Sequence, residues 1–181
     1  DMEDSRCFAE RARRQGFEII LHAPMEPHDL GTMQAPERMI TSLLDSGQVI
    51  AMLDGFFSTV PGAAGMNNHM GSKATTDPLL MGLVMRDHKK RGLYFLDSRT
   101  HAASRAHEAA RMAGVPALQR DVFLDHERNR AYIRDRLYDL ARIAAVRGQA
   151  LGIGHVTHPD MYHVLREMLP KLRKIGIQFV H

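Results

Sequence analysis

Side chains that can bind a metal or transfer a proton follow five short apolar segments of this sequence. Neutral histidine and carboxylate groups suit a divalent metal such as zinc, which in catalytic sites usually has three protein ligands and an open position. Such a metal lowers the pKa of a bound water and polarises a carbonyl, while a further carboxylate can act as base and a histidine as acid. The polar residues after the five segments are, in order, His22 and Glu26; Asn67, Asn68 and His69; Asp97, Ser98 and Arg99; Asp121 and Asp125; and His155 with His158.

Each of these residues also has a structural explanation. A single histidine after a strand is more often a hydrogen-bonded structural residue than a ligand. Asp97 could cap the helix that follows it, and Asn67 and Asn68 could be turn residues. Arg99 could orient a base or bind an anionic group, but it could also pair with Asp97 or Asp121 for stability. The convergence of five strand ends favours a functional site, because active groups of α/β proteins gather beyond the carboxyl ends of strands.

A recurring pattern predicts the elements that position these residues. A basic helix end meets a glycine, a short apolar run and then a polar cluster, which predicts a helix C-cap followed by a buried strand. The order of strands and helices predicts a parallel sheet with right-handed crossovers, either open or closed into a barrel. The clearest strands are expected at 18–21, 93–96, 150–153 and 177–180, and helices at 77–92, 104–114, 129–148 and 159–176, with 35–62 as one helix broken near Gly47 or two short ones.

Composition excludes several classes of protein. The 181 residues fit one domain, and 44% hydrophobic with 25% charged residues is ordinary for a globular protein. No apolar run approaches the roughly 20 residues of a membrane span. The net charge of +3 comes mostly from basic helix ends, which argues against a nucleic-acid-binding face. The single cysteine, Cys7, excludes a disulfide framework and a multi-cysteine metal site.

Signatures of other enzyme classes are missing from the sequence. No GxSxG elbow, P-loop or GxGxxG fingerprint follows a strand, which argues against a serine hydrolase, an NTPase and a dinucleotide enzyme. Ser72 could be a nucleophile, but it does not belong to a known nucleophile motif.

Five strings, "LHAPMEP", "GMNNHMGS", "GLYFLDSRT", "RDVFLD" and "IGH", in this order and spacing, resemble the divergent polysaccharide deacetylase family over essentially the whole chain. The resemblance implies a distorted (β/α) barrel of about seven parallel strands and an exported or periplasmic bacterial protein. Classical polysaccharide deacetylases are metal-dependent enzymes that remove acetyl groups from N-acetylated sugars. By position, His69 resembles the first histidine of their His-x-x-x-His metal motif, and His155 the late histidine that protonates the leaving amine. Asp121 and Asp125 fall near the acidic motif that orients catalytic groups.

The sequence departs from the classical pattern at two places. Lys73 stands four residues after His69, where the classical enzymes have a second histidine, and Ser72, His22 or Asp97 could replace that ligand. The apolar strand ending in Asp-Asp that normally opens the family has no counterpart here. We therefore expect residues 1–181 to be a single domain that is incomplete at its N-terminal end.

These observations lead to one expected function and one alternative. We expect a metal-dependent carbohydrate deacetylase or hydrolase, with zinc as cofactor, that acts on an N-acetylated cell-envelope glycan in the periplasm or outside the cell. The alternative is a non-catalytic cell-envelope protein of the same fold that binds glycan or a protein partner. Neither a nucleic-acid partner nor a membrane span is expected. The predicted residues are His155, Asp121 and Asp97 for catalysis; Asn67, Asn68, Arg99, Asp125 and Glu26 for substrate binding; and His69 and His22 for the metal.

Overall fold

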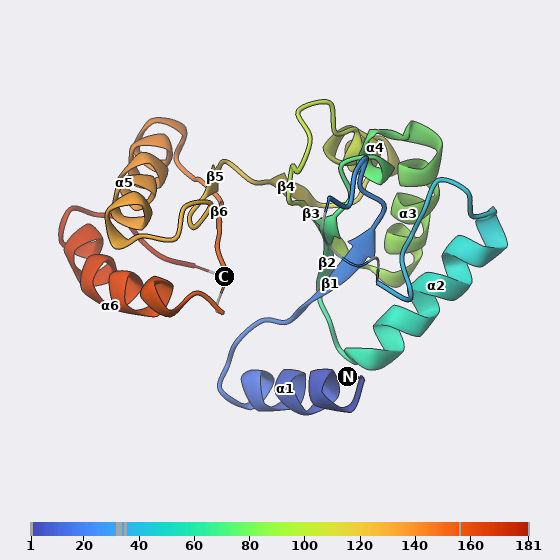
Figure 1. Cartoon of the computed structure of the whole chain (residues 1–181), viewed down its shortest axis with the longest axis horizontal. Helices are drawn as coiled ribbons and strands as arrows, with labels where there is room; N and C mark the ends of the chain where they lie inside the picture. The colour runs from blue at the N-terminus through green and yellow to red at the C-terminus, as the bar shows by residue number, and fades with distance from the viewer. Residues whose placement is uncertain (1, 32–33, 35, 156, 181) are drawn as a thin grey trace. The chain divides into compact units, whose positions relative to one another are not determined.

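The chain divides into two compact units, Asp1–Gln119 and Arg120–His181. The computed structural model, shown in Figure 1, describes residues 2–31, 34, 36–155 and 157–180. Each unit has its own hydrophobic core. The expectation of a single domain over residues 1–181 stays a prediction.

The first unit contains a four-stranded parallel sheet in which each strand pairs with the next one along the chain. The register aligns His22 with Asn67, and Asn67 with Leu96, so the carboxyl ends of neighbouring strands meet at one edge of the sheet. The elements are α1 (Met2–Arg14), β1 (Ile20–Met25), α2 (Ser46–Thr59), β2 (Gly65–Met70), the 3₁₀ helix η1 (Ala74–Thr76), α3 (Pro78–Arg91), β3 (Tyr94–Asp97), α4 (Ala106–Ala113) and β4 (Ala117–Gln119).

Local sequence signals explain where these helices begin and end. Before α3, the Asp77 side chain accepts hydrogen bonds from the Leu79 and Leu80 amides, and Pro78 occupies the first turn. The helix ends at Gly92, whose φ of 70° is a left-handed conformation that glycine adopts without strain. The core beneath the helices combines apolar side chains of α2, α3, β2 and β3, including Leu53, Met66, Met81, Met85 and Phe95, all fully buried.

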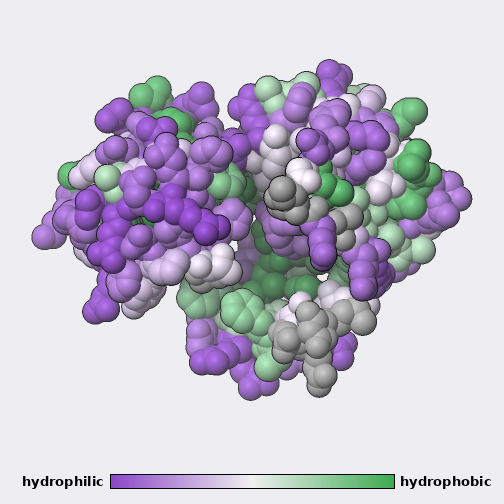
Figure 2. All heavy atoms as spheres, in the orientation of Figure 1, coloured by the Kyte–Doolittle hydropathy of each residue, from purple (hydrophilic) through white to green (hydrophobic). Residues whose placement is uncertain are grey.

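The second unit is smaller and is built around two helices. A short parallel pair, β5 (Val122–Phe123) and β6 (Gly152–Ile153), accompanies α5 (Arg130–Arg147) and α6 (Pro159–Lys174). Apolar side chains of the two helices form the core, which includes Ile133, Leu137, Val164, Met168 and Leu172. Figure 2 shows that the visible face of α5 and α6 is mostly hydrophilic, as expected for amphipathic helices.

The α/β class with parallel strands is confirmed, and so are the four helices expected at 77–92, 104–114, 129–148 and 159–176. The described residues contain six strands in two sheets, so the closed barrel of about seven strands stays a prediction. None of the described helices is long and apolar enough to cross a membrane.

Two expected elements differ in the structure. The segment 35–62 contains one helix, α2, because Asp45 and Gln48 form a capping box that starts it at Ser46; Ala35 lies outside the described residues. The strand expected at 177–180 is wrong, because this segment pairs with no strand. Ile177 and Phe179 pack instead against the core of the second unit.

Candidate functional site

Two histidines on the neighbouring strands β1 and β2 meet: His22, within β1, and His69, near the carboxyl end of β2. The parallel register places His22 opposite Asn67 and brings His69 two residues further along β2. His22 Nδ1 lies 2.9 Å from Asn67 Oδ1, and His22 Nε2 lies 3.0 Å from His69 Nδ1. The two imidazole rings are edge-on, with centroids 4.8 Å apart. The structure therefore brings together three residues that the sequence placed at two separate strand ends.

The amide of Asn67 fixes the tautomers of both rings. Asn67 Nδ2 donates to Ser98 Oγ at 3.2 Å, so Asn67 Oδ1 accepts the proton on His22 Nδ1. In a neutral ring this leaves the lone pair of His22 on Nε2, which accepts from His69 Nδ1–H. The proton of neutral His69 then lies on Nδ1 and its lone pair on Nε2. The result is a directional chain of hydrogen bonds from His69 through His22 and Asn67 to Ser98.

Asn68 connects the ends of β2 and β3. Its Oδ1 accepts from the Ser98 amide at 2.8 Å, and its Nδ2 donates to the Met70 carbonyl at 2.7 Å. Asn68 is 1% exposed. Met70 has a φ of 54°, a left-handed conformation that is strained for a side chain of its size. Such strain persists only where surrounding bonds hold it, and it concentrates at functional sites.

The Asp97 carboxylate shapes the loop that follows β3. Its Oδ1 accepts from the Arg99 amide at 2.8 Å, and its Oδ2 accepts from Ser104 Oγ at 2.8 Å. Arg99 also has a positive φ, 48°. The side chain of Asp97 is buried, and these contacts are those of a residue that orders a turn. A catalytic role for Asp97 and a substrate contact for Arg99 stay predictions.

Glu26 and Lys73 form an ion pair beside the same edge of the sheet. Lys73 Nζ lies 2.7 Å from Glu26 Oε1, while Glu26 Oε2 accepts from the amide and the hydroxyl of Ser42 at 2.9 and 2.8 Å. Burial would raise the pKa of Glu26, but the hydrogen bonds from Lys73 and Ser42 outweigh it, and the pKa lies below its ordinary value. Lys73, which stands where a second metal-binding histidine was expected, is thus bound to a carboxylate. Ser72 likewise has a structural partner, because its Oγ accepts from the His28 amide at 2.9 Å.

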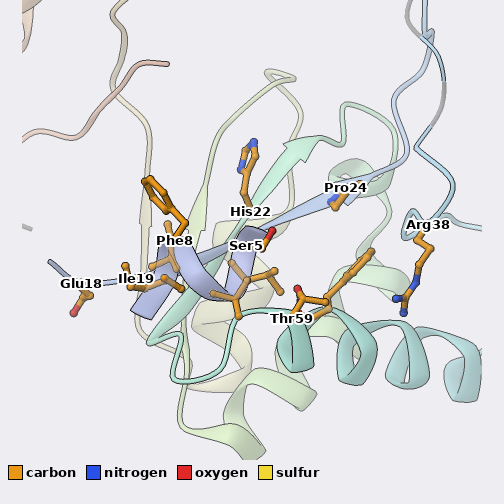
Figure 3. A pocket seen from close by; sticks show the side chains of 13 residues that line it. Ser5, Phe8, Glu18, Ile19, His22, Pro24, Arg38 and Thr59 are labelled. Atoms are coloured by element: carbon orange, nitrogen blue, oxygen red, sulfur yellow. Dashed lines mark hydrogen bonds between the residues drawn. The ribbon is translucent and has the colours of Figure 1, made fainter. Parts of the chain in front are cut away.

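A mostly apolar pocket of about 880 Å³ lies along β1 in the first unit. Figure 3 shows Ser5 and Phe8 reaching it from α1, His22 from β1 and Thr59 from α2. His22 of the histidine pair is therefore among the residues that line this pocket. The lining combines these residues with Ala9, Glu18, Ile19, Ile20, Leu21, Pro24, Arg38, Phe56 and Val60.

Asp125 and His155 form an acid–base dyad in the second unit. Asp125 Oδ2 accepts from the His155 amide at 2.7 Å, and Asp125 Oδ1 lies 3.2 Å from His155 Nδ1. The Asp125 side chain is 1% exposed, whereas that of His155 is 53% exposed. The carboxylate thus holds the tautomer with a proton on Nδ1 and leaves Nε2 on the far side of the ring for proton transfer.

Asp121 lies between β4 and β5 and has other partners. Its Oδ2 accepts from the Leu151 amide at 2.9 Å, and its Oδ1 pairs with Arg147 at 3.0 Å. These contacts connect β5 to the segment before β6. Asp121 thus has a structural role, and its catalytic role stays a prediction.

The histidine pair offers two of the donors that a metal site requires. The facing nitrogens of His22 and His69 are 3.0 Å apart, close to the roughly 3.3 Å that separates two nitrogens bound to one tetrahedral zinc. Ligation through both would require the proton on His69 Nδ1 to move to Nε2. Within the described residues, no group of three His, Cys, Asp or Glu side chains is placed to hold a metal ion. The described residues therefore fit part of a metal site and do not complete one.

Ser42 and Ser104 belong to this region, although no sequence pattern indicates it. Ser42 lies 16 residues after Glu26, and Ser104 lies seven residues after Asp97. Neither serine belongs to a motif, so only the fold shows that they hold the two carboxylates.

Comparison with known sequences identifies the family of this chain and two relatives. The sequence matches the family described as divergent polysaccharide deacetylase over residues 1–181. It is 36% identical over 175 residues to the uncharacterized protein YibQ of Escherichia coli K12, covering 95% of this chain and 53% of that protein. It is 34% identical over 168 residues to an uncharacterized protein of Haemophilus influenzae, covering 93% of this chain and 59% of that protein. The chain thus spans little more than half the length of these relatives.

A solved structure shares the fold. The crystal structure of the uncharacterized protein ATU2773 from Agrobacterium tumefaciens C58 matches with a TM-score of 0.88 and 29% identity. The match covers 97% of this chain and 71% of that protein.

Proposed function

Because this chain belongs to the divergent polysaccharide deacetylase family, we propose that it is a metal-dependent hydrolase that removes acetyl groups from an N-acetylated cell-envelope glycan. The observation that supports the proposal is the His22–His69 pair on two neighbouring parallel strands, held in one orientation by Asn67. Location in the periplasm or outside the cell, and closure of the strands into a barrel, belong to the same proposal.

His22 and His69 would hold the metal, for which zinc is the expected ion. A histidine ligand commonly donates its second ring N–H to an oxygen that fixes the ring, and Asn67 Oδ1 has this position toward His22. The bound metal would supply Lewis-acid chemistry toward the acetamide carbonyl. Ser98 supports the arrangement from the other end of the Asn67 amide.

The acid–base dyad would carry the proton transfer. With Nδ1–H directed to Asp125, His155 can present a proton on Nε2 to a leaving amine when the ring is charged. The buried Asp125 carboxylate stabilises that charged ring and keeps its orientation. Substrate contacts by Arg99, Asp125 and Glu26, and catalytic roles for Asp97 and Asp121, complete the set of proposed residues. Asn67 and Asn68, which were predicted to contact substrate, are proposed to position the site instead.

Metal content tests the first part of this proposal. The full chain, loaded with zinc and dialysed, is expected to retain the ion, whereas His22→Ala and His69→Ala should retain less. His163→Ala is a matched control, because His163 lies on an exposed part of α6. Equal zinc content in the wild type and in both variants would refute the assignment of the pair as ligands.

A second candidate function is a non-catalytic protein that binds glycan or a protein partner. The Glu26–Lys73 ion pair favours it, because an ammonium group bound to a carboxylate occupies the position of an expected metal ligand. The two candidates differ in one measurement. The hydrolase is expected to release acetate from N-acetylglucosamine oligomers in the presence of zinc, and the binding protein is not.

A further inference from the structure

A second pocket, of about 550 Å³, lies beside the acid–base dyad in the second unit. Phe123 gives it an apolar wall, and polar groups come from Asp125, His126, Arg128, His155 and His158. All of these residues belong to Arg120–His181, so the pocket is a feature of this unit by itself.

Three polar residues of this pocket have partners. Asp125 is buried, and its oxygens lie within hydrogen-bonding distance of the amide and of the ring nitrogen Nδ1 of His155. His158 caps α6 by accepting from the Asp160 amide at 3.2 Å. Asp160, the first carboxylate along α6, pairs with Arg130 at 2.6 Å.

Arg128 differs from the arginines that follow it. Among the residues that the structure describes, it has no carboxylate partner, although it lines the pocket and is exposed. Every arginine on α5 has one: Arg130 with Asp160, Arg134 with Glu167, Arg136 and Arg142 with Asp139, and Arg147 with Asp121. Arg128 thus brings to the lining of this pocket a positive charge that no carboxylate of the described residues pairs with.

We propose that this pocket binds an oxyanion of the substrate, with Arg128 as the residue that recognises it and His126 beside it. A guanidinium group presents paired N–H donors that match a carboxylate or a phosphate, and such charge-assisted bonds are about twice as strong as neutral ones. The proposal rests on the proposed function and deepens it, because it identifies the substrate as an acidic glycan. The negative group would be a uronic-acid carboxylate or a phosphate ester on a sugar of the chain.

Binding to defined saccharides tests this inference without any chemical step. The probes are a disaccharide of glucuronate and N-acetylglucosamine, its neutral counterpart with glucose, and N-acetylglucosamine 6-phosphate, each titrated into the full chain by calorimetry. The wild type should prefer an acidic probe, and Arg128→Gln should lose about tenfold or more of that affinity. Arg142→Gln is the matched control, since Arg142 is an exposed arginine paired with Asp139, and it should leave the affinity unchanged.

Each outcome decides the inference. Preference for glucuronate identifies a carboxylate, and preference for the phosphate probe identifies a phosphate ester. Equal affinity for the acidic and neutral probes, binding of none of them, or equal losses in Arg128→Gln and Arg142→Gln would overturn it. Acetate release is a separate readout: its absence together with Arg128-dependent binding would refute the hydrolase alone, and its presence without acidic preference would refute this inference alone.

Discussion

Replacing Glu26 with glutamine removes a negative charge and keeps the size of the side chain. It therefore tests how much this charge contributes to holding the end of β1 against the loop after β2. The carboxylate accepts three hydrogen bonds, one from Lys73 Nζ and two from Ser42. Its side chain is 16% exposed, whereas that of Lys73 is 41% exposed. The Ser42 bonds are therefore expected to contribute more than the ion pair, which solvent screens.

The expected cost of Glu26→Gln follows from these partners. Hydrogen bonds to a charged group contribute about 1.5–3 kcal/mol, against about 0.5–1.5 kcal/mol for neutral ones. Glutamine removes the charge from the two Ser42 bonds and from the Lys73 ion pair, and the ion pair contributes less than about 1 kcal/mol. Together these changes should lower the free energy of unfolding by about 2 kcal/mol. For a chain of this size, that corresponds to a fall in Tm of about 4–8 °C.

The cost should depend on pH in a defined direction. The pKa of Glu26 is lowered in the folded state, because the bonds from Lys73 and Ser42 outweigh the opposing effect of burial. A lowered carboxylate pKa stabilises the fold above the ordinary value of 4.5, and this contribution disappears as the pH falls through the folded-state value. The difference between wild type and Glu26→Gln should therefore be largest near neutral pH and shrink in acid.

Urea unfolding at neutral and acidic pH measures this difference directly. Glu10→Gln is the control, since Glu10 has an exposed, 3.9 Å ion pair with Arg14 on α1 and should change the free energy of unfolding by less than about 0.5 kcal/mol. A loss for Glu26→Gln no greater than that of Glu10→Gln, or one that grows in acid, would show that the charge of the Glu26 carboxylate does not hold the loop.

Three further predictions concern the dyad, the core and the sheet. Asp125→Asn should lower the rate of acetate release by about 100-fold or more, because the imidazole loses the carboxylate that holds its proton on Nδ1. His88 is buried, and burial lowers its pKa below the ordinary 6.5, so the free energy of unfolding should fall as the pH drops below 6.5; His88→Phe should flatten this slope in urea titrations. Gly65→Ala should lower Tm, because a Cβ there would lie 2.7 Å from the ring and carbonyl of Tyr94, whereas Gly82→Ala, within α3, should raise it slightly.

Helices were predictable from the sequence because their signals are local. Asp77 and Pro78 start α3 and Gly92 ends it, all within sixteen residues. The strand predicted at 177–180 is wrong, because a short apolar run fits a strand and a segment packed on the core equally well. Ile177 and Phe179 face the core of the second unit, and this outcome depends on the position of α5 and α6 rather than on the run itself.

The histidine pair was partly predictable and the Glu26–Lys73 pair was not. Parallel strands bring their carboxyl ends together, which is enough to expect His22 near Asn67 and His69. Glu26 and Lys73 are 47 residues apart in loops beyond the strands, where no periodicity fixes the direction of a side chain. Backbone bonds from the Lys73 and Ala74 amides to the Glu26 carbonyl bring these loops together, and they become visible only in the fold.

The two asparagines of "NNHMG" are better explained by positioning than by direct substrate contact. Each amide has both its oxygen and its nitrogen engaged: Asn67 with His22 and Ser98, and Asn68 with Ser98 and Met70. Both side chains are buried, so a substrate could reach them only by breaking a bond that fixes the His22 tautomer or the end of β3. Asn67→Asp, which keeps an acceptor for His22, should therefore retain more zinc than Asn67→Leu, which has none. Equal zinc retention in the two variants would contradict the positioning role.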